Sequence, residues 1–198
     1  MTTTGVQRRA LPVLVAAISL VMYLFVVLVW EPMGAILGLL SDDAFYYLQI
    51  ARNIVDGYGS TFDRIAPTNG YHPIWMAIVI PLAWIAGESG QGLAMLTMGV
   101  NGLIAVATLL LLYRLVERFI APGLGLLAVA VALLPNVLWT LLNGLETGLL
   151  LLVTTSLLWA CFSHRIHELG ASARGSLAFG ALLGAVTLVR LDSVFLLV

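Results

Sequence analysis

Two adjacent carboxylates, Asp42 and Asp43, follow a serine where a polar stretch of the chain turns into a periodic one. A carboxylate in such a place can act as a general base or help to hold a divalent metal ion. Consecutive residues of a helix point about 100° apart, so the two acids are not expected to do the same task. A structural role fits their position equally well, because acids in the first turn of a helix complement its dipole.

Glu146, in the segment LLNGLETGLL, is a second candidate acid. One structural alternative is specific: Asn143 as N-cap and Glu146 three residues later would form a capping box, which needs no further function. The functional alternative is an acid at the outer edge of a membrane, on the same side as the first pair. There Glu146 would bind substrate or, together with Asp42, hold a metal ion.

Arg190 and Asp192 lie inside an apolar run, TLVRLDSVFL. A charge near the bilayer centre costs about 2.5–3.5 kcal/mol on insertion scales, so such residues usually face a polar cavity and have a partner. The two residues point about 200° apart on a helix and are not expected to pair with each other. Each is predicted to find a partner elsewhere, with snorkelling of Arg190 as the structural alternative.

Three further polar residues, Arg52, Arg64 and His72, are candidates for substrate binding. A guanidinium group can neutralise the charge that develops on a phosphate. A lone histidine such as His72 is more often a hydrogen-bonded structural group than a metal ligand.

The composition predicts a membrane protein. The chain has 198 residues, of which 61% are hydrophobic and 10% charged, and a mean hydropathy of +1.06. Ordinary soluble chains carry about 25% charged residues, so this one cannot present a soluble surface. Its basic residues are nine arginines and its net charge is −1, which does not suggest a nucleic-acid partner. We predict an all-α, multi-pass transmembrane helical bundle that forms one membrane domain over residues 1–198.

Five apolar stretches approach the roughly 20 residues that a membrane span needs: 11–30, 92–113, 122–142, 145–162 and 176–198. A sixth run of 14 residues contains Pro81 and is typical of a re-entrant or interfacial segment. If this run does not cross, most arginines face the cytoplasm, as the positive-inside rule favours: Arg8, Arg9, Arg114, Arg118, Arg165 and Arg174. The five-span topology puts the N-terminus in the cytoplasm, and it makes residues 31–74 the first extracytoplasmic loop of a protein of the cytoplasmic membrane.

Within that loop, residues 43–56 have apolar side chains every three or four positions. This period predicts an amphipathic helix at the bilayer surface, with Ser41 as N-cap and Gly57 as C-cap. Asn53 falls on its predicted polar face. The glycines, Pro67 and the Asn-Gly pair that follow predict a structured loop.

The order of these segments resembles the amino-terminal half of the GT-C superfamily of glycosyltransferases. The residues that carry the resemblance are SDDAFYYLQIARNIVDGYGSTFD, TNGYHPIW, NGLETGLL and VRLDSVFLL, after an anchor helix. Members of this family are multi-pass enzymes that take sugar from a polyprenyl-phosphate carrier. The resemblance implies that Asp42 or Asp43 is the catalytic base or lies beside the metal, that Glu146 is a second acid, and that residues 1–198 begin a longer GT-C-like module.

The chemistry of such a transfer suits these residues. Phosphate is already a competent leaving group, so one carboxylate that accepts the proton of the acceptor hydroxyl can suffice. A cation, either an arginine or a divalent metal such as Mg²⁺ or Mn²⁺, would stabilise the departing phosphate. We therefore predict an inverting hexosyl- or pentosyltransferase with Asp43 as base and Asp42 as helper or metal neighbour. Its acceptor would be an extracytoplasmic glycan, lipid or protein.

The alternative is a multi-pass transporter or flippase, in which Arg190 and Asp192 line a substrate path and Pro81 and Pro135 break helices. A non-catalytic membrane scaffold is a third class. Only the transferase would consume a carrier-linked sugar.

Overall fold

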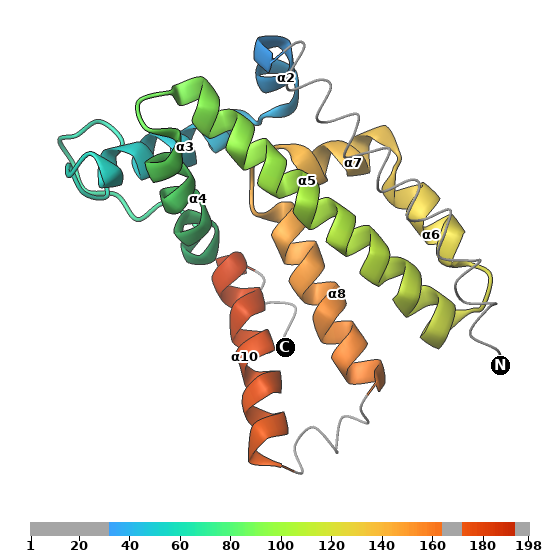
Figure 1. Cartoon of the computed structure of the whole chain (residues 1–198). Helices are drawn as coiled ribbons and strands as arrows, with labels where there is room; N and C mark the ends of the chain where they lie inside the picture. Colours follow the sequence, from blue (N-terminus) through green and yellow to red (C-terminus); the bar gives the residue numbers. More distant parts are fainter. Residues whose placement is uncertain (1–31, 164–171, 193–198) are drawn as a thin grey trace.

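The computed structural model describes residues 32–163 and 172–192 (Figure 1). The regular secondary structure of these residues is helical, with an isolated bridge between Thr61 and Pro67 as their one β-type pairing. The predicted all-α class is confirmed. The predicted span 11–30, Arg8, Arg9, Arg165 and the end of the chain lie outside the described residues.

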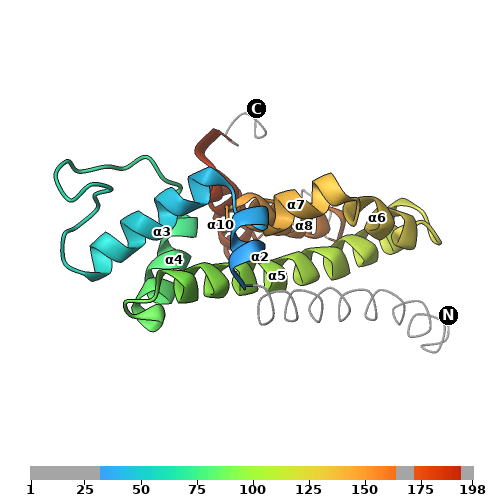
Figure 2. The same cartoon turned by 90° about the horizontal axis from the view of Figure 1, so that it is seen from above.

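The helices follow one another along the chain, and a long loop connects α3 to α4 (Figure 1). They are α2 (Pro32–Leu39), α3 (Asp42–Val55), α4 (Pro73–Ala86), α5 (Gly90–Leu115), the π-helical turn η1 (Val116–Ile120), α6 (Gly125–Ala132), α7 (Pro135–Leu142), α8 (Thr147–Ser163) and α10 (Ala173–Val189). Figure 2 shows α3 and the loop after it extending to one side of the longer helices.

Helices α5 and α8 pack side by side and run in the same direction. Gly148 at the start of α8 lies against Ile104 in the middle of α5, and the Phe119 ring in η1 contacts the ring of Trp159 near the end of α8, with 5.2 Å between centroids. Helix α10 packs on α8 and runs in the opposite direction. The end of α10 lies near the start of α8, because the N–H of Leu191, just after α10, donates to His72, which faces Glu146 just before α8. The start of α8 and the end of α10 therefore lie at the same end of the bundle.

Helix α3 is amphipathic, as predicted, and its apolar face packs against α4 and α5. Ser41 occupies the N-cap position, although its side chain makes no capping hydrogen bond, and Gly57 follows the helix with a left-handed φ of +84°. Asn53 was predicted on the polar face, but it is fully buried. Its Nδ2 donates to the carbonyls of Thr61 and Phe62, both at 2.9 Å, so this polar side chain organises the following loop.

Both ends of α4 are held by side chains of α3. The backbone N–H of His72 donates to the Tyr47 hydroxyl at 3.0 Å, and Arg52 Nη1 donates to the carbonyl of Gly87. Helix α4 contains Pro81 and has 14 residues, about 21 Å in length. Its two ends thus stay close to the same short helix.

The apolar stretch 122–142 was predicted to be one span, but it forms two helices, α6 and α7, that meet at 72°. Pro135 explains the break, because proline has no N–H to continue a helix and restricts the residue before it to an extended conformation. Leu134 has a ψ of 140°, which is extended backbone.

Among the described residues, one helix is long and apolar enough to cross a membrane, Gly90–Ile120 with 31 residues. Counting the bent pair α6 and α7 as one span gives two. Helices α4, α8 and α10 have between 14 and 17 residues. The described residues thus contain one or two candidate spans, and five or six spans remain a prediction.

The predicted capping box at Asn143 and Glu146 is wrong. Asn143 ends α7, and its Oδ1 accepts from the N–H of Leu145 at 3.2 Å in a tight turn. Helix α8 begins at Thr147, one residue after Glu146. The Glu146 carboxylate is therefore used elsewhere.

The turn at Gly144 is expected to tolerate no side chain. Gly144 has a φ of +83°, and a Cβ there would overlap Leu40 Cδ2 and lie 2.8 Å from Ala44 Cβ. Gly144→Ala should lower the free energy of unfolding by about 1–2 kcal/mol for the left-handed backbone and by about 1–3 kcal/mol more for crowding. Thermal unfolding in detergent micelles measures the loss.

Gly57→Ala is the matched control. Gly57 has nearly the same φ, but nothing lies within 4 Å of an added Cβ, so only the backbone cost applies. Equal losses for the two variants would contradict the tight docking of α3 on the 143–144 turn.

Candidate functional site

Four segments that are distant in the sequence meet around the hydroxyl of Tyr47. This side chain comes from α3, is 7% exposed, accepts the N–H of His72 at 3.0 Å and donates to Glu146 Oε2 at 3.4 Å. The residues after α10 complete the group, since the N–H of Leu191 donates to His72 Nδ1 at 3.3 Å. We call Tyr47, His72, Glu146, Arg190 and Asp192 the Tyr47 cluster.

Glu146 is the buried acid of the Tyr47 cluster, with a side chain that is 6% exposed. Its Oε1 lies 3.5 Å from His72 Nε2, and its Oε2 accepts from Tyr47. A buried carboxylate is costly unless polar or cationic groups surround it, and both neighbours here are potential donors. Helix α10 packs against both α8 and α4, and this arrangement brings Glu146 close to its hydrogen-bonding partners.

His72 connects the cluster in two directions. It is the N-cap residue of α4, and its Nδ1 accepts a backbone hydrogen bond from Leu191. Its other ring nitrogen, Nε2, faces Glu146 Oε1 at 3.5 Å. His72 therefore acts as a structural bridge between α4, α8 and α10.

The prediction that Arg190 and Asp192 would not pair is wrong. Helix α10 ends at Val189, and Arg190 has an extended conformation with a φ of −148° and a ψ of 113°. The helical angle of 200° no longer applies, and Arg190 Nε lies 3.0 Å from Asp192 Oδ1. This ion pair lowers the pKa of Asp192 from its usual value, and the exposed surroundings make the pair a weak contribution to stability.

Asp42 and Asp43 are exposed in the first turn of α3, next to the turn that carries Glu146. The N–H of Ser41 donates to the carbonyl of Asn143 at 2.9 Å, and Ala44 packs against Gly144. Trp75 Nε1 adds a bond to the Gly144 carbonyl at 3.0 Å. The first turn of α3 and the Tyr47 cluster therefore share one end of the bundle, as predicted for the candidate acids.

Burial raises the pKa of Tyr47 well above its ordinary value, and the hydrogen bond and negative charge of Glu146 add to this effect. The N–H of His72 and the positive charge of Arg190 act in the opposite direction. The phenol therefore keeps its proton and remains a hydrogen-bond donor to Glu146 at any ordinary pH.

The structure does not bring Arg52 and Arg64 into this cluster. Arg64 Nε donates to Asn53 Oδ1 at 3.0 Å, its Nη2 lies 3.4 Å from Asp56 Oδ2, and its guanidinium stacks over the Tyr58 ring. These contacts show that Arg64 holds the loop between α3 and α4 against the end of α3. Arg52 lies on the opposite face of α3 from Tyr47, as five helical residues separate the two by about 140°.

The loop between α3 and α4 is structured, as predicted. Ser60 Oγ donates to the Thr68 carbonyl at 2.6 Å. The backbone amides of Ala66 and Ile65 donate to Asp63, and these hydrogen bonds lower the pKa of its carboxyl. Together with Asn53 and Arg64, they tie a segment without helices to the end of α3.

The described residues do not fit the predicted metal site. Nowhere in residues 32–163 and 172–192 do three His, Cys, Asp or Glu side chains gather closely enough to hold a metal ion. Asp42 is exposed while Glu146 is buried against His72 and Tyr47.

Tyr47 and Trp75 were missed as members of this site. Neither was a candidate residue, and both are buried with their polar atoms hydrogen-bonded. A usable signal was present, because a buried tyrosine or tryptophan normally needs a partner for its O–H or N–H.

No protein-family model matches this sequence, and searches among curated proteins and among solved structures return no match.

Tyr47→Phe removes a donor to Glu146 and the acceptor of the His72 N–H. Leaving buried polar groups unpaired should lower the free energy of unfolding by about 1–3 kcal/mol. Tyr46→Phe, the same change on the exposed face of α3, is the control and should have little effect.

Alkaline titration tests the position of Tyr47 separately. The folded state holds the phenol proton more tightly than the unfolded state, so this contribution to stability is complete below about pH 10 and is lost as the pH rises further. Wild type should therefore lose stability more steeply above about pH 10 than Tyr47→Phe. Parallel losses, together with a smaller tyrosinate absorbance of the variant in the folded state, would contradict the burial of this hydroxyl.

Proposed function

We propose that this chain belongs to a multi-pass membrane glycosyltransferase of GT-C type, which moves a sugar from a polyprenyl-phosphate donor to an extracytoplasmic acceptor with inversion. The observation that carries the proposal is the convergence of four distant segments at one end of the bundle. There the first turn of α3, with its exposed acids, packs on the turn that precedes the buried Glu146, and the Arg190–Asp192 ion pair flanks Leu191, whose N–H donates to His72.

The distribution of arginines supports an extracytoplasmic location for this end. Arg114 and Arg118 lie near the end of α5, and Arg174 lies at the start of α10. Figure 1 places these helix ends away from the Tyr47 cluster. By the positive-inside rule, the arginine end faces the cytoplasm and the Tyr47 cluster faces outward.

The attachment of α4 to α3 supports the five-span topology. Tyr47 and Arg52 hold the two ends of α4 and are only about 7.5 Å apart along the α3 axis. A helix of 14 residues that is tied to one short surface helix at both ends is suited to stay on a single side of the bilayer.

Asp43 remains the favoured base for a geometric reason. Residues four apart share one face of a helix, so Asp43 lies one turn before Tyr47, on the face that is directed at the cluster. Asp42 is rotated by about 100° from that face. Asp43 is exposed and can meet an acceptor hydroxyl, whereas Glu146 is buried among its partners.

In the proposed reaction, Asp43 accepts the proton of the acceptor hydroxyl as its oxygen attacks the anomeric carbon. The bond between that carbon and the phosphate oxygen breaks, and the polyprenyl phosphate leaves with the electron pair. Attack from the side opposite to the phosphate inverts the anomeric centre. Arg190 supplies positive charge toward the leaving phosphate, while Glu146 and His72 bind sugar hydroxyls.

The transporter alternative is less well supported. It needs Arg190 and Asp192 inside a span, where they would line a path. Both residues follow the last residue of α10 and are 40% and 59% exposed in their side chains. Their position at the end of a helix suits a surface site better than a translocation path.

Asp43→Asn in membranes that contain the full-length protein should reduce sugar transfer by about 10²–10⁴-fold, as expected for loss of a general base. Release of radiolabelled sugar from a polyprenyl-phosphate donor measures the rate. Asp42→Asn should cause a smaller loss.

Asp63→Asn is the matched control. Asp63 is an acid of the predicted extracytoplasmic segment 31–74, and the amide oxygen of its replacement can still accept from the N–H groups of Ile65 and Ala66. It should leave transfer unchanged. Near-normal turnover of Asp43→Asn, with normal membrane insertion, would remove Asp43 from the mechanism.

Cysteine labelling tests the sidedness. In a Cys161→Ala background, Glu88→Cys should react with an impermeant maleimide from outside, and Pro122→Cys only after permeabilisation. Both positions are exposed. The reverse pattern would show that α4 crosses the membrane and would overturn the five-span topology.

A further inference from the structure

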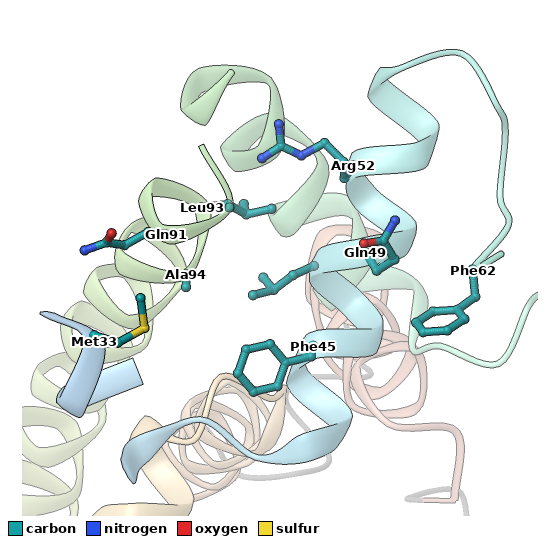
Figure 3. Close-up of a pocket in the computed structure, with 10 residues that line it drawn as sticks. Met33, Phe45, Gln49, Arg52, Phe62, Gln91, Leu93 and Ala94 are labelled. Carbon is teal, nitrogen blue, oxygen red and sulfur yellow. The ribbon is translucent and has the colours of Figure 1, made fainter. Parts of the chain in front are cut away.

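A cavity of about 430 Å³ lies on the side of α3 opposite to Tyr47 (Figure 3). Side chains of α2, α3 and the first turns of α5 line it, and Phe62 adds to it from the loop. Phe45, Leu48 and Leu93 give it a mainly apolar wall. Met33 and Gln91 are exposed, so the cavity is open to the surroundings.

Arg52 brings one positive charge to this apolar cavity. Figure 3 shows its side chain extending from α3 across the cavity's upper edge. Nη1 donates to the Gly87 carbonyl, while Nη2 is buried and has no hydrogen-bond partner within the described residues. A buried guanidinium N–H without a partner is unusual and points to a missing acceptor.

The start of α5 adds to the positive potential. Gly90 and Gln91, the first two residues of this long helix, line the cavity. The N-terminal end of a helix carries a partial positive charge and favours anions. Among the cavity-lining residues there is no acid to oppose Arg52.

We infer that this cavity binds an anionic, phosphate-bearing membrane lipid, with the phosphate at Arg52 and the start of its hydrocarbon chain along Phe45, Leu48 and Leu93. A soluble polar ligand would need more polar groups than Arg52, Gln49 and Gln91 provide. A lipid fits because the cavity lies between an amphipathic helix and the first turns of the longest candidate span. The inference rests on the proposed membrane location and is independent of sugar transfer.

The test is native mass spectrometry of the purified full chain after exchange into micelles that contain one added lipid. The three arms are phosphatidylglycerol, a polyprenyl phosphate and zwitterionic phosphatidylcholine. Wild type should retain either anionic lipid in preference to phosphatidylcholine. Tighter retention of the polyprenyl phosphate identifies a carrier site, and equal retention of both anionic lipids identifies a general anionic-lipid site.

Arg52→Gln should reduce retention of the anionic lipid by about tenfold or more, as expected for loss of a charged hydrogen bond. Arg52→Lys should restore part of it. Arg114→Gln removes the same charge from an exposed position about 36 Å along α5 from Gly90 and should leave retention unchanged.

Arg52 also holds Gly87, so a second pair of variants tests charge without touching that bond. Gln91→Glu should weaken retention about two- to fivefold and Gln91→Lys should strengthen it by a similar factor. Fold stability should change in the opposite direction, because an acid is favoured at a helix N-terminus and a cation is not. Equal retention of phosphatidylglycerol and phosphatidylcholine by wild type, or no effect of either Gln91 variant, would overturn the inference.

Discussion

The hydroxyl of Tyr47 is the interaction on which the site depends. As an acceptor it fixes the start of α4, and as a donor it meets Glu146 just before α8. A buried hydroxyl that lost either partner would leave an unpaired group in an apolar surrounding. The positions of α3, α4 and α8 are thus coupled through one atom, although the residues that carry these contacts are up to 99 positions apart.

Glu146 explains why the polar residues gather at this point. A carboxylate that is almost fully buried needs donors and positive charge nearby, or it would be expelled or protonated. Tyr47 and His72 contact it from two other segments, and the positive charge of Arg190 acts on Tyr47. The end of α10 at Val189 contributes to this arrangement, because the N–H of Leu191 is then available to donate to His72.

The periodic spacing of apolar residues is the reason why the sequence could predict the positions of helices. The period of three to four residues in α3 and the long apolar run of α5 reflect local geometry, and both helices lie close to their predicted residues. The first turn of α3 and Glu146 also come together in space, while the membrane side on which they lie stays a prediction. Helix length was harder to predict, because apolar residues continue past the points where Pro135 and Arg190 end regular helices.

Side-chain partners were the least predictable feature, because they depend on tertiary contacts. Asn53 has the sequence position of a solvent-facing residue, and only the return of the loop over α3 explains its burial. The local Asn143–Glu146 spacing suggested a cap, but Tyr47 and His72 contact the Glu146 carboxylate from distant segments. A local motif predicts a contact only where no distant segment competes for the same atoms.

The bonds of Asn53, Arg64 and Asp63 give the loop between α3 and α4 a fixed shape without regular secondary structure. Phe62 of this loop stacks on Tyr46 of α3, with 4.2 Å between ring centroids, and together the two rings form an exposed aromatic face. A molecule that settles on this face meets groups already in place, so little conformational entropy is lost on contact. Rigidity in this protein therefore extends beyond its helices, to the loop between α3 and α4.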